Sequence, residues 1–265
     1  MAAKLGFGLG LVRNVEQVID ILYNRARYRL FGKVRANVDL RFKISPTLNP
    51  PDKRADLTLK NIFDDAAETE GGTPNEKLYR ALAANTEHFL DAHCQLAKAR
   101  VVNAVQSCLH DKNYGASTED LNEILKEQLV EVLDKAKSDI QNVVENETNK
   151  VKNMSTLDAI SQMDAVLGVD DPTVYFGGPV DQHTCPECLR MFYLADGITP
   201  RVWKASELSS GYFHRHDQVP SISGCHPNCR HSLCSTLIGY GFVGGHLTFI
   251  EPGYDVWKEQ RGIKF

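Results

Sequence analysis

Five of the seven cysteines lie between residues 185 and 234, and their spacing constrains the fold more than any other feature of the sequence. Cys185 and Cys188 are two residues apart, so a single turn can present both sulfurs to a tetrahedral ion. Further along the chain, His226 and Cys229 share a second tight turn. Three cysteines and one histidine form a complete structural zinc site with no open coordination position. We therefore predict a zinc site with these ligands: Cys185, Cys188, His226 and Cys229.

Other interpretations of the same residues stay open. Cys225 and His231 lie in the second turn, and either could replace one of the four ligands. The cysteines could also be buried free thiols, or the first pair a redox disulfide, although no thioredoxin-like βαβ pattern surrounds that pair. Zinc deaminase chemistry is excluded because the required His-x-Glu and Pro-Cys-x-x-Cys elements are missing.

The odd number of cysteines argues against a disulfide framework, since Cys94 and Cys108 stand alone in helical patterns. No apolar run approaches the roughly 20 residues that cross a bilayer, and no signal-peptide cleavage pattern follows the first residues. We therefore expect a chain that contacts no membrane and is made and kept in a reducing cytoplasm.

Long helices dominate the first two thirds of the chain. Apolar residues recur at three- and four-residue spacing over residues 14–31, from Pro74 to about residue 110, and from a cap at Ser117 to about residue 167. The last stretch is long enough that we expect either a break near Ser155 or an exposed rod. The economical arrangement of the two longer segments is a helical hairpin.

The remaining segments carry strand and loop signals. Residues 38–44 alternate as a short strand, residues 47–74 have the prolines of an extended arm with one helical turn near 59–63, and residues 173–176 look like a strand. We predict an α+β protein in three parts: a basic helix, strand and extended arm at 1–73, a helical hairpin domain at 74–168, and a small, loop-rich, zinc-stabilised α+β knuckle domain at 169–265.

Charge is divided unevenly along the chain. Residues 1–60 contain 12 Lys/Arg against 5 Asp/Glu, whereas the remaining residues contain 18 against 29. A basic arm on an acidic body is typical of a segment that binds nucleic acid or the acidic face of a partner protein. A solvated basic helix face is the plainer alternative.

A metal-dependent nuclease is the serious enzymatic alternative, because the residue types of a histidine-asparagine-histidine site are present: His214, His216, Asp217, His226, Asn228 and His231. Against it, residues 181–234 hold five acidic and five basic side chains, whereas a nuclease usually needs a basic groove. We expect His214 and His216 to be solvated loop residues. Glu145 and Glu147 look like a solvated or capping pair, and no glycine-rich phosphate loop or Gly-x-Ser-x-Gly element is present.

Residues 120–250 resemble the phage Mu F-like head-morphogenesis, or minor head, proteins. In that family a long helix with a Glu-Thr-x-x-x-x-Asn-like element leads into a strand, an Asp-x-x-Thr-Cys-x-x-Cys turn and a His-Pro-x-Cys-Arg-Cys turn. The matching elements here are Glu147-Thr148 with Asn149 and Asn153, DQHTCPEC at 181–188, and HPNCRH at 226–231. His231 replaces the last cysteine of that pattern, which favours His226 and Cys229 as ligands and leaves Cys225 a bystander.

The resemblance implies a non-enzymatic virion protein, present in several copies, that binds portal, capsid or neck proteins during head assembly in the host cytoplasm. A basic arm, an extended proline-rich segment and long amphipathic helices suit a protein whose function is contact. We expect the arm to reach a neighbouring subunit or the packaged DNA. The alternatives are a metal-dependent nuclease and a zinc-stabilised DNA-binding module.

Overall fold

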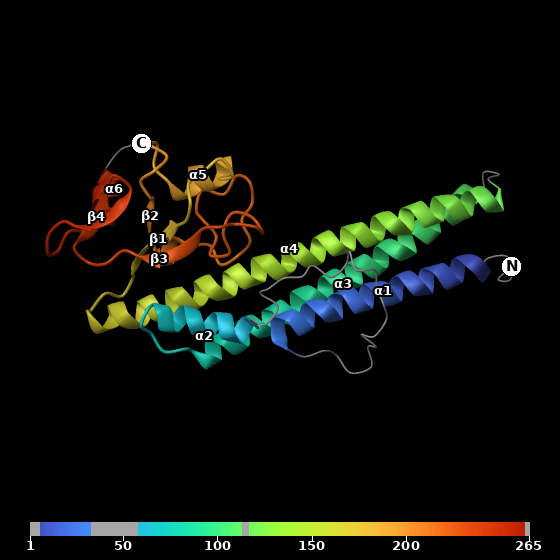
Figure 1. Ribbon diagram of the computed structural model, residues 1–265, viewed down its shortest axis with the longest axis horizontal. Helices are drawn as coiled ribbons and strands as arrows, with labels where there is room; N and C mark the ends of the chain where they lie inside the picture. Colours follow the sequence, from blue (N-terminus) through green and yellow to red (C-terminus); the bar gives the residue numbers. More distant parts are fainter. Residues whose placement is uncertain (1–5, 33–57, 113–116, 263–265) are drawn as a thin grey trace. The chain divides into compact units, whose positions relative to one another are not determined.

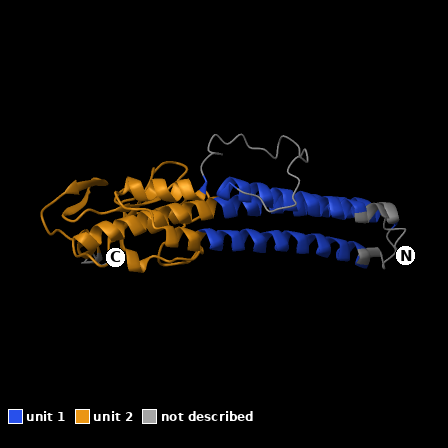
Figure 2. Cartoon of the chain, turned by 90° about the horizontal axis from the view of Figure 1, so that it is seen from below, with its two compact units in different colours: residues 1–58, 83–144 blue, residues 59–82, 145–265 orange. Residues whose placement is uncertain are grey.

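The computed structural model describes residues 6–32, 58–112 and 117–262. The chain is a mixed α+β protein with a long helical N-terminal part and small sheets, which confirms the predicted class at that level. It divides into two compact units, and Figure 2 colours them separately: residues 1–58 with 83–144 form the first, and residues 59–82 with 145–265 the second. The strand predicted at 38–44 lies outside the described residues, and the three-part division of the sequence stays a prediction.

The first unit consists of α1 (Gly6–Phe31) and portions of α3 (Glu76–Lys112) and α4 (Thr118–Val166). Its apolar stripes form a core that includes Ile19, Leu90 and Val101. Ion pairs join its helices: Arg27 with Asp91, Lys98 with Asp20 at 2.7 Å, and Arg100 with Asp139 at 2.6 Å. Helix α1 begins at Gly6, earlier than the residue 14 at which the apolar pattern placed its start.

The helix boundaries partly correct the sequence prediction. Asn75, rather than Pro74, starts α3, because its Oδ1 accepts the Leu78 N–H at 3.1 Å. The predicted cap of α4 is confirmed, since Ser117 Oγ accepts the Asp120 N–H at 3.1 Å. Of the two alternatives for α4, a break near Ser155 or a rod, the break is absent, because the helix runs for 49 residues. The Ser155 hydroxyl donates to the Phe63 carbonyl. No helix in the described ranges is long and apolar enough to cross a membrane.

The second unit contains α2 (Leu59–Thr69), the start of α3 and the end of α4. Helix α2 has 11 residues, more than the single turn predicted there, because Leu59, Phe63 and Ala67 recur at four-residue spacing and are all buried. The chain leaves α4 at Gly168, where φ is +76° and a side chain would be strained.

Beyond α4, the second unit forms a small α+β fold (Figure 1). Three antiparallel strands run in the order β2 (Val202–Lys204), β1 (Thr173–Gly177) and β3 (Ser232–Ser235), which confirms the strand predicted at 173–176. A hairpin of β4 (Tyr240–Val243) and β5 (His246–Phe249) follows. The remaining helices are α5 (Pro186–Phe192), a 3-10 turn (Ala205–Glu207) and α6 (Val256–Gly262).

The core of this α+β part contains cysteines as well as apolar side chains. The rings of Phe176 and Phe192 stack 4.4 Å apart at its centre. Cys188, Cys225 and Cys229 belong to the same buried cluster. The small core of this part therefore includes three thiol groups next to its aromatic rings.

Candidate metal centre

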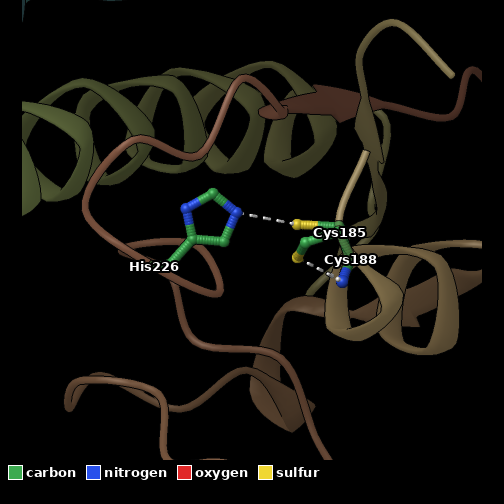
Figure 3. A group of neighbouring side chains, drawn as sticks. All are labelled: Cys185, Cys188 and His226. Atoms are coloured by element: carbon green, nitrogen blue, oxygen red, sulfur yellow. Dashed lines mark hydrogen bonds between the residues drawn. The ribbon is translucent and has the colours of Figure 1, made fainter. Parts of the chain in front are cut away.

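Helix α5 positions the first two cysteines. Cys185 is its N-cap, and Pro186 takes the first helical turn, where the missing N–H of proline costs nothing. The Cys185 Sγ accepts the Cys188 N–H at 3.3 Å, so the turn directs a backbone donor at sulfur. Figure 3 shows Cys185 and Cys188 side by side with the imidazole of His226 facing them.

A tight turn before β3 supplies the second half of the site. The Cys229 N–H donates to the His226 carbonyl at 3.0 Å, and the Cys225 N–H donates to Cys229 Sγ. Gly224 makes the turn possible, because its φ is +89° and a Cβ there would lie 2.9 Å from the Cys229 Cβ. The glycine and the closely spaced donors therefore bring Cys229 to face α5.

The ligand atoms fall into two overlapping groups, within each of which all atoms lie within 4.8 Å of one another. The first group is Cys185, Cys188 and His226. The second is Cys188, Cys229 and His231. Cys188 Sγ belongs to both, 3.4 Å from His226 Nε2 and 3.8 Å from Cys229 Sγ.

These distances suit a tetrahedral metal ion. Bond lengths of about 2.3 Å to sulfur and about 2.0 Å to nitrogen put two sulfurs of one zinc about 3.8 Å apart and a sulfur and a nitrogen about 3.5 Å apart. The Cys188–Cys229 and Cys188–His226 separations agree with these two values. The five clustered residues can therefore hold a metal ion.

Crowding of thiols in the core shifts their titration. A hydrogen bond with Cys225 raises the pKa of Cys188 well above its usual range, and burial adds to the effect. Contact with Cys188, and then burial, raises the pKa of Cys229 to about 12. Burial lowers the pKa of His226, which favours the neutral imidazole that a metal needs. A bound cation is the species that would stabilise thiolates packed this closely.

The structure brings together all four predicted ligands and two neighbours that the sequence interpretation had set aside. The predicted four are divided between the two groups, with Cys229 in the second. His231, doubted because it replaces a cysteine of the family pattern, is only 4% exposed, and its Nδ1 lies 3.8 Å from Cys229 Sγ. Cys225, treated as a bystander, is buried and hydrogen-bonded to Cys188.

Helix α4 holds the turn that carries the second half of the site. Asn153 is buried, its Nδ2 donates to the Ile222 carbonyl at 2.7 Å, and its Oδ1 accepts the Leu233 N–H at 3.1 Å. One helical turn earlier, Asn149 Nδ2 donates to the Pro227 carbonyl at 3.2 Å. The asparagines of the helix motif therefore position the metal-site turn from both of its flanks.

Glu147 differs from its predicted role. It was expected to be solvated or to cap a helix, but it is 1% exposed and accepts a hydrogen bond from the Tyr212 hydroxyl. Burial and this contact raise the pKa of Tyr212 far above its usual value. Sequence spacing could not show this, because the partner lies 65 residues away in a loop without a periodic pattern.

An ion pair joins the two halves of the site at the surface. Both guanidinium nitrogens of Arg230 contact the Asp181 carboxylate, at 2.6 and 2.8 Å. The same carboxylate accepts the His183 N–H at 2.8 Å. Arg230 and this N–H hold the pKa of Asp181 well below its usual range. The ion pair therefore links Asp181, four residues before Cys185, to Arg230, which directly follows Cys229.

Two of the histidines proposed for a nuclease site, His214 and His216, lie outside the metal-ligand groups, whereas His226 and His231 belong to them. His214 and His216 are exposed, as predicted, in a turn where the His214 N–H donates to Asp217. Within the described ranges, the groups with metal-ligand spacing are the two that share Cys188.

Comparisons with protein-family models, curated proteins and solved structures find no match to this chain.

Proposed function

We propose that this chain is a structural virion protein of a tailed phage, a minor capsid or head-tail connecting protein with a zinc centre at Cys185, Cys188, His226 and Cys229. The observation that carries the proposal is the Cys/His cluster at the core of the small α+β fold, in which Cys188, Cys229 and His231 are buried and Cys185 and His226 are partly exposed. The resemblance to Mu F-like minor head proteins supplies the biological setting.

Zinc is the metal that best suits this ligand set. Thiolate sulfur selects soft or borderline ions, and imidazole is compatible with zinc, whereas calcium and magnesium prefer oxygen. The Cys188 Sγ and Cys229 Sγ atoms are 3.8 Å apart, which is the separation expected for two sulfurs bound to one tetrahedral zinc ion. A small fold with little apolar core gains from a metal that links its segments, because the binding free energy becomes folding free energy.

A structural centre fits the surroundings of the cluster better than a catalytic one. A catalytic zinc keeps an open position for water, and its ligands line a cleft. Here Cys188, Cys229 and His231 are buried among apolar side chains, and Phe192 and Tyr193 contact the His231 ring. The proposal is therefore non-enzymatic.

Several residues that carry the family resemblance hold the cluster in place. Asn149 and Asn153 hold the second turn, and Asp181 is paired with Arg230 across the two halves. This use of the motif supports a rigid docking domain whose partners are portal, capsid or neck proteins. Residues 1–60, with 12 Lys/Arg against 5 Asp/Glu, supply a basic arm for an acidic partner or the packaged DNA.

The test is incorporation into phage heads. In a phage whose genome encodes this chain, the wild-type protein is expected in purified heads in several copies, and the Cys185→Ser, Cys188→Ser double variant is expected to be lost from them. Cys94→Ser is the matched control, because this thiol lies on α3 outside the metal-site groups. Absence of the wild-type chain from heads would contradict the proposal.

Three further assays test the nuclease alternative and the basic arm. DNA degradation with added magnesium or manganese, lost in His214→Ala, would instead indicate the nuclease. Heads that assemble normally with a chain lacking residues 1–60 would contradict the role of the basic arm. DNA binding by that arm is expected to weaken steeply with salt, because each phosphate contact releases a counterion.

A further inference from the structure

The cluster contains more ligand residues than one tetrahedral ion can use. Five potential ligands form its two groups, Cys185, Cys188, His226, Cys229 and His231, and Cys225 contacts Cys188 from outside them. One zinc ion binds four. A single-ion site would therefore leave at least one of the five grouped ligands unbound.

The two groups of ligands share one atom, the Cys188 Sγ. This thiolate has lone pairs for two metal ions, so each group can supply three donors to an ion of its own. Cys225 contacts Cys188 but lies outside both groups, so a second bridge through Cys225 would require its sulfur to move toward them on metal binding. Two bridging and four terminal ligands would then fill the eight positions of two tetrahedral ions.

The charges and the burial of these groups agree with two ions. Four thiolates balance two divalent cations, whereas one zinc with three thiolates leaves a net negative charge inside an apolar core, where an uncompensated charge is costly. The His231 side chain is buried, at 4% exposure, and its Nδ1 lies 3.8 Å from Cys229 Sγ. Binding through Nδ1 would give this buried ring a strong interaction.

We propose that the centre is dinuclear: one zinc bound by Cys185 and His226, a second by Cys229 and His231, with Cys188 bridging both and Cys225 completing the cluster. Binding releases four thiol protons to solvent and involves no change of oxidation state. The inference rests on the zinc centre of the proposed function and goes beyond it in ligand set and number of ions.

Native mass spectrometry of the full chain, equilibrated with zinc and then freed of loosely bound metal, tests the proposal. Two zinc ions per wild-type chain are expected, and one in His231→Ala. His214→Ala is the matched control and is expected to keep two, because this exposed histidine lies outside both groups. One zinc in the wild type would overturn the dinuclear centre.

A spectroscopic readout covers the case in which His231→Ala does not fold. The wild-type chain loaded with cadmium-113 is expected to give two cadmium resonances coupled through a shared thiolate. A single resonance would overturn the proposal. One zinc per chain in a protein that enters phage heads leaves the proposed function intact, and two zinc ions in a protein absent from heads contradicts that function alone.

Discussion

The side-chain amide of Asn153 joins helix α4 to the metal-site turn by donating to the Ile222 carbonyl at 2.7 Å. Its oxygen accepts from the Leu233 N–H, on the other side of the turn. A single buried side chain thus fixes both ends of the segment that carries His226, Cys229 and His231. Groups that orient metal ligands from outside commonly change metal affinity when removed.

Asn153→Ala is therefore expected to weaken zinc binding by roughly 10–100-fold. It leaves a buried carbonyl and a buried N–H without partners, which costs about 1–3 kcal/mol of unfolding free energy each. Competition with a chelator measures the affinity. The control is Asn142→Ala at an exposed position of the same helix, which is expected to change neither quantity. Equal affinities in the two variants would contradict the positioning role.

Tyr212→Phe is expected to destabilise the fold by about 1–3 kcal/mol, because it removes a hydrogen bond from the buried Glu147 carboxylate. Urea unfolding followed by circular dichroism measures the change. Tyr28→Phe is the control, since the Tyr28 side chain is 59% exposed. A loss no greater than that of the control would show that the Tyr212–Glu147 contact contributes nothing to stability.

Gly178→Ala tests the packing around His231. A Cβ at position 178 would lie 2.7 Å from His231 Cδ2 and 3.0 Å from its Cα, so the backbone or the ring has to move. Overpacking of this kind typically costs about 1–3 kcal/mol. Gly211→Ala, with its nearest neighbour at 3.7 Å, is the matched control. Thermal unfolding compares them, and identical melting temperatures would contradict the close packing.

The Asp181–Arg230 pair predicts a pH dependence of defined sign. The folded pKa of Asp181 is below its unfolded value of about 3.9. Its contribution to stability is therefore complete above that unfolded value and is lost as pH falls through the lower folded pKa. Carboxyl carbon NMR is expected to show Asp181 titrating below its usual range in the wild type.

Arg230→Gln removes the main cause, so Asp181 is expected to titrate closer to its usual value in this variant. Arg190→Gln is the control, because Arg190 pairs with Glu187 and not with Asp181. A normal Asp181 pKa in the wild-type chain would show that the pair is not formed in solution.

Local signals in the sequence were sufficient to predict several elements. The apolar period predicted α1 and α4, Ser117 predicted a cap that forms, and the spacing of Cys185 and Cys188 predicted a turn with both sulfurs on one side. These features depend on residues within a few positions of one another. The length of α2 was underestimated because prolines before it suggested an extended segment.

Features set by distant contacts could not be predicted from spacing. Ser155 lies within an unbroken α4, and its hydroxyl donates to the Phe63 carbonyl 92 residues earlier, a contact that no local pattern contains. Glu147 is buried because a loop brings Tyr212 to it. His231 joins the cluster because the turn after Gly224 and strand β3 direct it inward, whereas a substitution relative to the family pattern argued against it.

Metal analysis of the chain purified without added metal tests the central claim most directly, with Cys188→Ser and Cys234→Ser as the matched pair. Cys188 belongs to both ligand groups, whereas Cys234 lies on β3 outside them. Bound zinc is predicted in the wild type and in Cys234→Ser, with its loss in Cys188→Ser. A wild-type chain that contains no zinc and binds none when it is supplied would contradict the account.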